Sequence, residues 1–259
     1  MKTIIGTPDK PWIDLTNHID ITGLHRLRLE IIRGIALSEE MNPSMYGQVL
    51  DSKFKDAYHT INYAKKSYNP EIRQHIEELT NMSGSAIDRR RRTAMYSNLV
   101  FGGYSSGWSI PVRSLPGQFA DKNYAATTVE SRNYPHFEKL MEWIRHLPFD
   151  EIGRVNIFLN NPYMGTPIHF DGATEILTHK NEFMWLTTEK KKFFLYDESE
   201  KKKYYIDSAA AFFDEMATHG TDADTAYKFS IRIDGVFTPE LRKAIGIDKL
   251  ENYCAKSLR

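Results

Sequence analysis

The sequence predicts an α+β fold in which a mainly helical first half precedes a run of short antiparallel strands. Up to residue 147, apolar side chains recur three or four positions apart, which is the spacing of one helix face. From Arg154 the period shortens to two, as in strands whose alternate residues face a core. We therefore expect a single domain with a helical and loop preface over 1–153, a β core over 154–237 and a C-terminal helix over 238–259.

The helices of the preface are marked by apolar residues at helical spacing and by signals at their ends. They are predicted over residues 24–35, 54–61, 72–79 and 135–147. Asn69 and Pro70 open the third of them, and Pro148 stops the last, because proline lacks the amide hydrogen that a continuing helix needs. The segment 93–134 is rich in glycine, serine and tyrosine, which predicts irregular strand and loop.

The strands of the core are predicted over residues 154–160, 182–188, 192–197, 204–207, 210–214 and 227–237. Two aromatic segments flank the turn at Asp197–Glu200 and predict a hairpin, whose lysine clusters we interpret as a solvated edge. About eight short strands after a helical preface are typical of a double-stranded β-helix, the jelly roll of the cupin type. The mouth of such a barrel gathers side chains from several strands. After the last strand, Thr238 and Pro239 open the C-terminal helix as its cap and first residue.

The charge balance argues against a nucleic-acid partner. The 259 residues contain 34 Lys plus Arg and 34 Asp plus Glu, which gives a formal net charge of zero. Proteins that bind nucleic acids generally show a marked basic excess. The run Asp88–Arg92 invites a phosphate-binding interpretation, but a solvated segment with local ion pairs is favoured.

The composition also predicts a cytoplasmic protein without a membrane anchor. A single cysteine, Cys254, excludes an internal disulfide and fits a reducing compartment. Pro8 and Pro11 interrupt the start of the chain, so no signal peptide is visible. No stretch approaches the ~20 apolar residues that span a bilayer.

A histidine and an aspartate with one residue between them predict a metal site. His169 and Asp171 lie on the same side of an extended strand, because side chains alternate with a period of two. A second imidazole would complete the two-histidine, one-carboxylate set that is diagnostic of oxygen-activating Fe(II) sites. His219, just before the final strand, is the favoured second imidazole, and His179 is the alternative. We interpret His136 and His146, on the predicted helix 135–147, as surface residues.

The last strand carries a candidate anion anchor. Arg232 lies opposite the apolar face of this strand, and a buried arginine needs an anionic partner. A guanidinium pairs with a carboxylate through two parallel hydrogen bonds. Lys228 shares the face of Arg232 and is the alternative anchor, and Ser230 on the same face offers a hydroxyl. Asn156 and Asn160, on the strand that precedes His169, either bind a ligand carboxylate or have a structural role.

The chain resembles the Fe(II)/2-oxoglutarate-dependent oxygenase superfamily. The resemblance lies in His169-x-Asp171, His219 and Arg232, which stand on a predicted barrel. The resemblance implies iron held by the first three side chains and 2-oxoglutarate chelated through its keto acid end, with Arg232 binding its distal carboxylate. It also implies consumption of O2, release of succinate and CO2, and hydroxylation or a related oxidation of a substrate. The frequent Arg-x-Ser pattern is missing, because Ile233 and Asp234 follow the arginine; Ser230 is the substitute hydroxyl.

We expect a small polar substrate, such as an amino acid or a natural-product intermediate. The segment 97–134 combines glycine and serine with polar and aromatic side chains suited to closing over a ligand, namely Tyr104, Trp108, Arg113 and Tyr124. The alternative is that these aromatic residues pack the helices against the barrel. Two other functions stay open: a cupin-type metal enzyme without 2-oxoglutarate, in which Arg232 forms a structural ion pair, and a non-catalytic jelly-roll binding protein.

Overall fold

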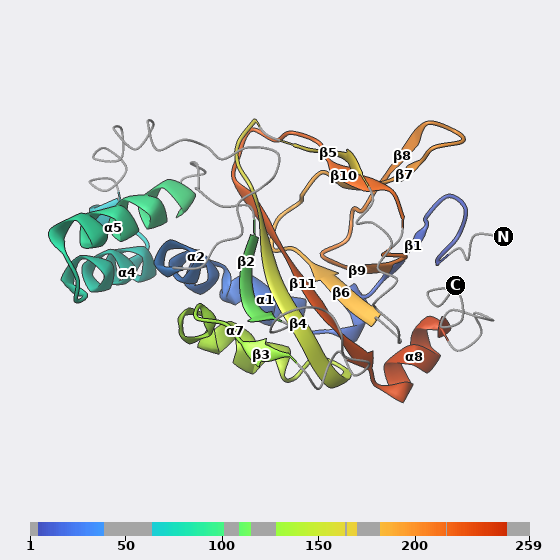
Figure 1. The fold of residues 1–259 in the computed structure, drawn as a ribbon, viewed down its shortest axis with the longest axis horizontal. Helices are drawn as coiled ribbons and strands as arrows, with labels where there is room; N and C mark the ends of the chain where they lie inside the picture. Colours follow the sequence, from blue (N-terminus) through green and yellow to red (C-terminus); the bar gives the residue numbers. More distant parts are fainter. Residues whose placement is uncertain are drawn as a thin grey trace.

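The computed structural model of the protein describes residues 5–38, 64–100, 109–114, 128–163, 165–169, 182–215 and 217–247. Its helices are η1 (Thr16–His18), α1 (Ile21–Arg26), α2 (Arg28–Leu37), α4 (Pro70–Asn81), α5 (Ala86–Val100), η3 (Tyr134–His136), α7 (Glu138–Ile144) and α8 (Pro239–Ile245). Its strands are β1 (Trp12–Asp14), β2 (Ser109–Ser114), β3 (Val129–Glu130), β4 (Phe149–Asn160), β5 (Thr166–His169), β6 (Glu182–Leu186), β7 (Phe193–Asp197), β8 (Lys202–Tyr205), β9 (Ala210–Phe213), β10 (His219–Thr221) and β11 (Lys228–Phe237). Figure 1 shows the helices around one side of the strands.

The strands form two antiparallel sheets, in the orders β1-β9-β6-β11-β4-β2-β3 and β5-β10-β7-β8. The pairing is nested, because β4 pairs with β11, β5 with β10, β6 with β9 and β7 with β8. A chain that folds back on itself in this way forms the two facing sheets of a jelly roll. The predicted α+β class and jelly-roll core are confirmed. The core begins at Phe149 rather than at 154, and β1, β2 and β3 of the preface extend its larger sheet.

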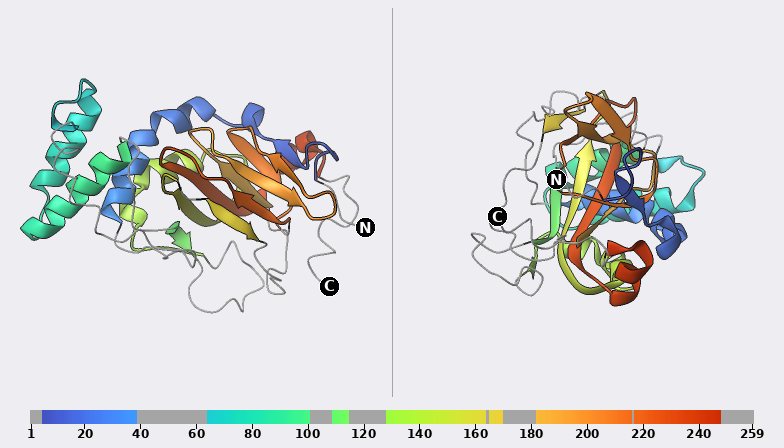
Figure 2. Two further views of the ribbon diagram at one scale, coloured as in Figure 1. Left: turned by 90° about the horizontal axis from the view of Figure 1, so that it is seen from above. Right: turned by 90° about the vertical axis from the view of Figure 1, so that its right-hand side faces the viewer.

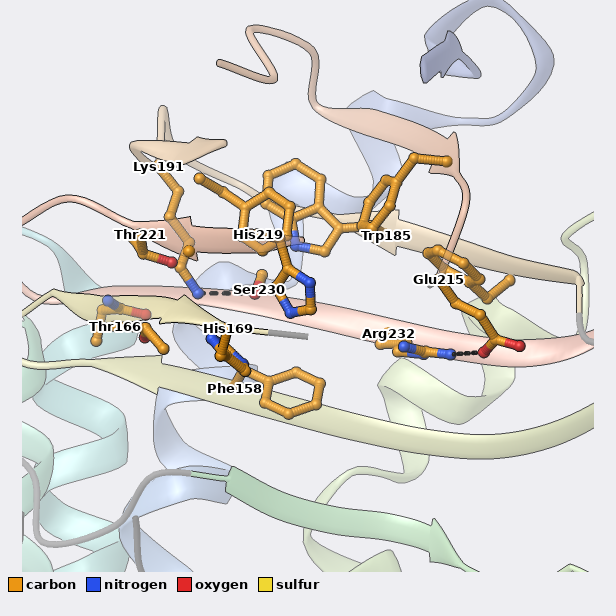
Figure 3. A pocket seen from close by; sticks show the side chains of 15 residues that line it. Phe158, Thr166, His169, Trp185, Lys191, Glu215, His219, Thr221, Ser230 and Arg232 are labelled. Carbon is orange, nitrogen blue, oxygen red and sulfur yellow. Dashed lines mark hydrogen bonds and ion pairs between the residues drawn. The ribbon is translucent and has the colours of Figure 1, made fainter. Parts of the chain in front are cut away.

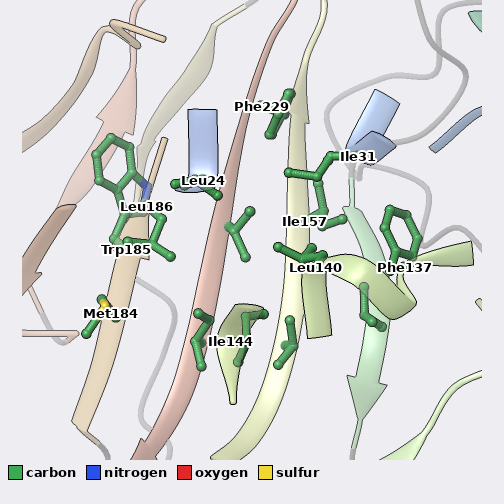
Figure 4. Packing of buried hydrophobic residues seen from close by; sticks show 14 of the residues in the cluster. Leu24, Ile31, Phe137, Leu140, Ile144, Ile157, Met184, Trp185, Leu186 and Phe229 are labelled. Carbon is green, nitrogen blue, oxygen red and sulfur yellow. The ribbon is translucent and has the colours of Figure 1, made fainter. Parts of the chain in front are cut away.

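The larger sheet has one apolar face, and the helices cover it. Ile157 of β4 and Phe229 of β11 pack there against Leu24, Ile31 and Leu140 of the helices, in one continuous core (Figure 4). Each such side chain contributes roughly 1.5–3 kcal/mol when it is fully buried. The opposite face of the same two strands, with Phe158, Asn160, Ser230 and Arg232, therefore points into the barrel.

Helix α5 contradicts the prediction of loop from residue 93 onward, and it also contains the arginine run. A reciprocal cap opens it: Asp88 N donates to Ser85 Oγ at 3.1 Å, and Ser85 N donates to Asp88 Oδ2 at 3.3 Å. This cap and the helix-forming arginines outweigh a sequence rich in polar residues. Together α4 and α5 form a hairpin that projects from the barrel (Figure 2).

Other helix predictions hold with changed ends. The predicted helix 24–35 is divided at Leu27 into α1 and α2, and 135–147 becomes η3 followed by α7. The predicted helix 54–61 lies outside the described residues. Thr238 Oγ1 accepts from Leu241 N at 3.3 Å, which confirms the cap of α8. The hairpin β7–β8 is confirmed as well, with Asp197 opposite Lys202. Within the described parts of the chain, no helix has the length and apolar character that crossing a membrane requires.

Candidate metal centre

His169 and His219 meet across the smaller sheet. They are direct partners on the antiparallel strands β5 and β10, and their ring centroids are 4.5 Å apart. Opposite residues of an antiparallel pair project their side chains to the same face, which here is the interior of the barrel. The nested strand pairing therefore brings together two imidazoles that are distant in the sequence (Figure 3).

Both rings are held in the same way by the backbone. Nδ1 of His169 lies 2.8 Å from the carbonyl oxygen of Pro167, and Nδ1 of His219 lies 2.8 Å from that of Ala217. A carbonyl oxygen only accepts hydrogen bonds, so each Nδ1 must carry the hydrogen. The neutral ring then has its lone pair on Nε2, which is the form of histidine that binds metals. Paired imidazoles of this kind suit iron, zinc or copper.

The third predicted ligand, Asp171, lies outside the described residues, and so does His179, the alternative imidazole. His169 is the last residue of β5, and Asp171 follows it by two positions in the sequence. The donor set of two imidazoles and one carboxylate stays a prediction.

The two histidines line a cavity of about 120 Å³ inside the barrel. Its walls are largely aromatic, formed by Phe158, Phe183, Trp185, Phe193 and Phe213. Polar groups gather at its two ends. In the view of Figure 3, Lys191, Thr166 and Thr221 lie on one side of the imidazoles, and Arg232 and Glu215 lie on the other.

Lys191 is a buried cation at the first of these ends. Its residue is only 4% exposed, and Nζ donates to Ser230 Oγ at 2.8 Å. Burial lowers the pKa of Lys191 to about 7, because the low dielectric of the interior disfavours the ammonium. Thr166 and Thr221 line the same end, and the buried Thr166 Oγ1 meets no hydrogen-bond partner among the described residues. An ammonium surrounded by hydroxyls is suited to an anion.

Lys191 contradicts the interpretation of the lysine cluster 190–192 as a solvated edge, because its side chain is buried. That interpretation holds for Lys190 and Lys192, which are exposed, but not for the residue between them. Lys191 has the same parity as Phe193, which lines the cavity from β7. The period of two therefore contained the signal: extending the strand pattern by two residues places Lys191 in the barrel.

Arg232 lies in the cavity, as expected for an anchor, but it already pairs with two carboxylates. Its Nε donates to Asp234 at 2.6 Å and its Nη2 donates to Glu215 at 2.9 Å. The guanidinium carbon lies 4.3 Å from the ring centroid of Phe183. Burial would raise the pKa of Asp234, but Arg232 and Arg154 hold it below its usual range.

Of the other predicted ligand-binding residues, Ser230 and Asn160 line the cavity, whereas Asn156, Lys228 and Arg113 lie outside its lining. Asn156 is opposite Arg232 on β4, and its buried Oδ1 has no hydrogen-bond partner among the described residues. Lys228 pairs with Glu189 at 3.0 Å, and Arg113 donates to Thr128 Oγ1 at 2.8 Å.

The expected substrate residues Tyr104, Trp108 and Tyr124 lie outside the described residues. His146 is exposed after α7, as expected, and His136 lies in η3, at a groove beside α2.

A second group of potential metal ligands lies among the helices. Glu30, Glu71 and His75 have ligand atoms within 4.8 Å of one another. Lys139 forms an ion pair with Glu30, and His75 Nδ1 lies 2.9 Å from the hydroxyl of Tyr96. These contacts tie α2, α4, α5 and α7 together, and they account for the burial of His75 without an ion.

Comparison with known proteins gives structural similarities only. The sequence matches no family model, and no curated protein matches it significantly. The viral collagen prolyl hydroxylase of Paramecium Bursaria Chlorella virus-1, in its 2OG complex, is 13% identical, with a TM-score of 0.27 over 50% of this chain and 80% of its own. A 2OG-Fe(II) oxygenase family oxidoreductase from Burkholderia pseudomallei is 7% identical, with a TM-score of 0.34 over 73% of this chain and 92% of its own.

The similar structures also include a lyase. The DMSP lyase DddQ from Ruegeria pomeroyi is 8% identical, with a TM-score of 0.27 over 72% of this chain and 92% of its own. Because these TM-scores are low, the jelly-roll assignment is based on the nested strand pairing instead. The chemistry of the site is inferred from the residues of the cavity.

Proposed function

We propose that this chain is an Fe(II)- and 2-oxoglutarate-dependent oxygenase that oxidises a small polar metabolite. The observation that carries the proposal is one cavity with two opposed imidazoles, His169 and His219, beside a buried ammonium, Lys191. His169, His219 and Asp171 would hold the iron. When bound, Fe(II) and 2-oxoglutarate supply the activation of O2, coupled to the release of succinate and CO2.

Lys191 is a better anchor for the distal carboxylate of 2-oxoglutarate than Arg232. Arg232 is paired with Asp234 and Glu215, so a ligand carboxylate with no accompanying positive charge would be uncompensated beside it, whereas among the described residues burial is the only cause that shifts the pKa of Lys191. A carboxylate beside Lys191 would stabilise the ammonium in a medium of low dielectric, where charge–charge interactions are strong. Ser230 accepts from Lys191, so its own hydroxyl hydrogen is available to the same carboxylate.

The remaining groups shape the site. Backbone acceptors at Pro167 and Ala217 keep the two imidazoles in the ligating tautomer. The aromatic walls exclude water and keep the dielectric low around Lys191. The hydroxyl of Thr166, which has no hydrogen-bond partner in the described part of the chain, supplies a further donor at the anion-binding end.

The proposal is tested by anaerobic addition of Fe(II) and then 2-oxoglutarate to the purified protein. We expect a weak visible absorption band that appears only with both, and that is lost in His219→Ala. Succinate formation in air should follow the same pattern. Iron binding without any spectral response to 2-oxoglutarate would favour a cupin-type metal enzyme. Absence of stoichiometric iron would favour a non-catalytic binding protein.

A further inference from the structure

The end of the cavity away from Lys191 carries a second set of charges. Ser230 and Arg232 are two residues apart on the same face of β11, so their Cα atoms are separated by about 6.6 Å along the strand. Glu215 follows β9 and precedes His219, and it pairs with Arg232. In the view of Figure 3, the two imidazoles separate this pair from Lys191.

The four charged side chains that the structure describes at this end pair with one another. Asp234 is fully buried and accepts from Arg154 at 2.8 Å and from Arg232 at 2.6 Å. Arg232 in turn donates to Glu215 at 2.9 Å. Two arginines and two carboxylates sum to zero net charge. Asp234 and Arg154 are positioning residues, because they hold Arg232, whereas Arg232 and Glu215 themselves line the cavity.

We propose that Glu215 and Arg232 bind the head group of a free α-amino acid substrate; this inference rests on the proposed oxygenase function. Its ammonium is received by Glu215 and its carboxylate by Arg232. A carboxylate has about four acceptor sites and a guanidinium five N–H donors, so each side chain can bind a ligand while it keeps its present partners. The aromatic walls receive the apolar part of the substrate.

The charge balance selects a zwitterion over a singly charged ligand. The side chains of Arg232 and Glu215 are only 12% and 17% exposed, so little water reaches them. A ligand with one charge leaves an uncompensated charge in this setting, which is strongly unfavourable. A zwitterion brings one charge of each sign and leaves the site neutral.

The packing around the pair makes its geometry rigid. The guanidinium of Arg232 lies over the ring of Phe183, which fixes its plane. Phe183 packs edge-on against Phe213 with centroids 4.8 Å apart, and Phe213 is two residues before Glu215. A head group bound here keeps the rest of the substrate against the aromatic walls, beside His169 and His219.

The test uses the full chain with Fe(II) and 2-oxoglutarate and measures succinate formation. Each of the twenty common L-amino acids is compared with its N-acetyl and its carboxamide derivative, which remove one charge each. We expect at least one free amino acid to stimulate succinate release, and both of its derivatives to lose at least tenfold in kcat/KM. Stimulation by either derivative that equals that of the free amino acid overturns the inference. So does a result in which none of the free amino acids stimulates succinate formation.

Variants separate this inference from the proposed function. Glu215→Gln keeps the shape of the side chain but removes its charge, so the preference for the free amino acid over its N-acetyl derivative should shrink at least tenfold. Glu200→Gln, at the exposed β7–β8 turn, is the matched control and should keep the full preference. An undiminished preference in Glu215→Gln contradicts the inference. If the unaltered protein instead shows no absorption band on anaerobic addition of Fe(II) and 2-oxoglutarate, the proposed function is overturned, and this inference with it.

Discussion

The ammonium of Lys191 donates a 2.8 Å hydrogen bond to the hydroxyl of Ser230, which joins the segment before β7 to strand β11 across the interior of the barrel. Ser230 belongs to the larger sheet, and Lys191 lies in the segment that connects β6 of that sheet to β7 of the smaller one. Their contact places a positive charge where burial opposes it, close to the two imidazoles that are candidates for metal ligation.

Replacing Lys191 by methionine should separate stability from binding. Lys191→Met removes a buried cation and keeps an apolar side chain of similar length, so the free energy of unfolding should rise by about 1–3 kcal/mol. The affinity for 2-oxoglutarate should fall at least 100-fold. Urea denaturation and anaerobic titration measure the two effects. Lys192→Met, at the exposed neighbouring position, should change neither; unaltered 2-oxoglutarate affinity in Lys191→Met would rule out the anchor.

The affinity for 2-oxoglutarate should depend on pH through Lys191. Its pKa of about 7 means that, above neutral pH, the ligand-free protein holds this lysine largely uncharged. Binding the carboxylate must then take up a proton, so affinity should fall as pH rises, by up to about tenfold per unit. Titrations at several pH values between 6 and 9 check this. Affinity that is flat in the wild type, or that falls as steeply in Lys191→Met, contradicts the assignment.

Stability should show the opposite trend with pH. Because burial lowers the pKa of Lys191 from 10.5 to about 7, the unfolded chain binds the proton more tightly than the folded protein. Between these two values the unfolded state carries more protons, so the contribution of Lys191 makes the folded state more stable as pH rises. Below about pH 7 the destabilisation is complete. The difference in unfolding free energy between wild type and Lys191→Met should therefore shrink from pH 7 to pH 10.

His169 and His219 are each expected to be essential for metal binding. His169→Ala and His219→Ala should each lower bound iron at least tenfold and leave the circular dichroism spectrum unchanged, because both side chains face a cavity rather than the packed core. Metal analysis of anaerobically loaded protein measures this. Asp171→Ala should behave in the same way, and His179→Ala should retain iron. Full loading of His219→Ala together with loss in His179→Ala would identify the other imidazole.

Arg232 should matter more for stability than for 2-oxoglutarate affinity. Arg232→Gln leaves the fully buried Asp234 with Arg154 as its remaining arginine partner, which should cost about 3–5 kcal/mol of unfolding free energy. Arg154→Gln, which removes the other partner from outside the cavity lining, should be destabilising as well. A loss of 2-oxoglutarate affinity confined to Arg232→Gln, with Lys191→Met unaffected, would restore the arginine as the anchor.

Local patterns were sufficient for much of this protein. The alternation in β4 and β11 separated the apolar face that the helices cover from the polar face of the barrel, because side chains alternate regardless of what lies opposite. The hairpin around Asp197 and the cap at Thr238 were likewise predictable, because each is formed within a few residues. The helix at Ala86–Val100 was missed, because its polar composition concealed a cap that is equally local.

Tertiary structure decided which side chains meet. The sequence by itself proposed His169 and His219 together, but only the pairing of β5 with β10 sets their rings 4.5 Å apart. The sequence placed Arg232 in the barrel, but not its partners Asp234 and Glu215, and it left Lys191 in a solvated cluster. Burial and ion pairing depend on neighbours from other strands, and a pattern of period two says which face a residue occupies but not what it finds there.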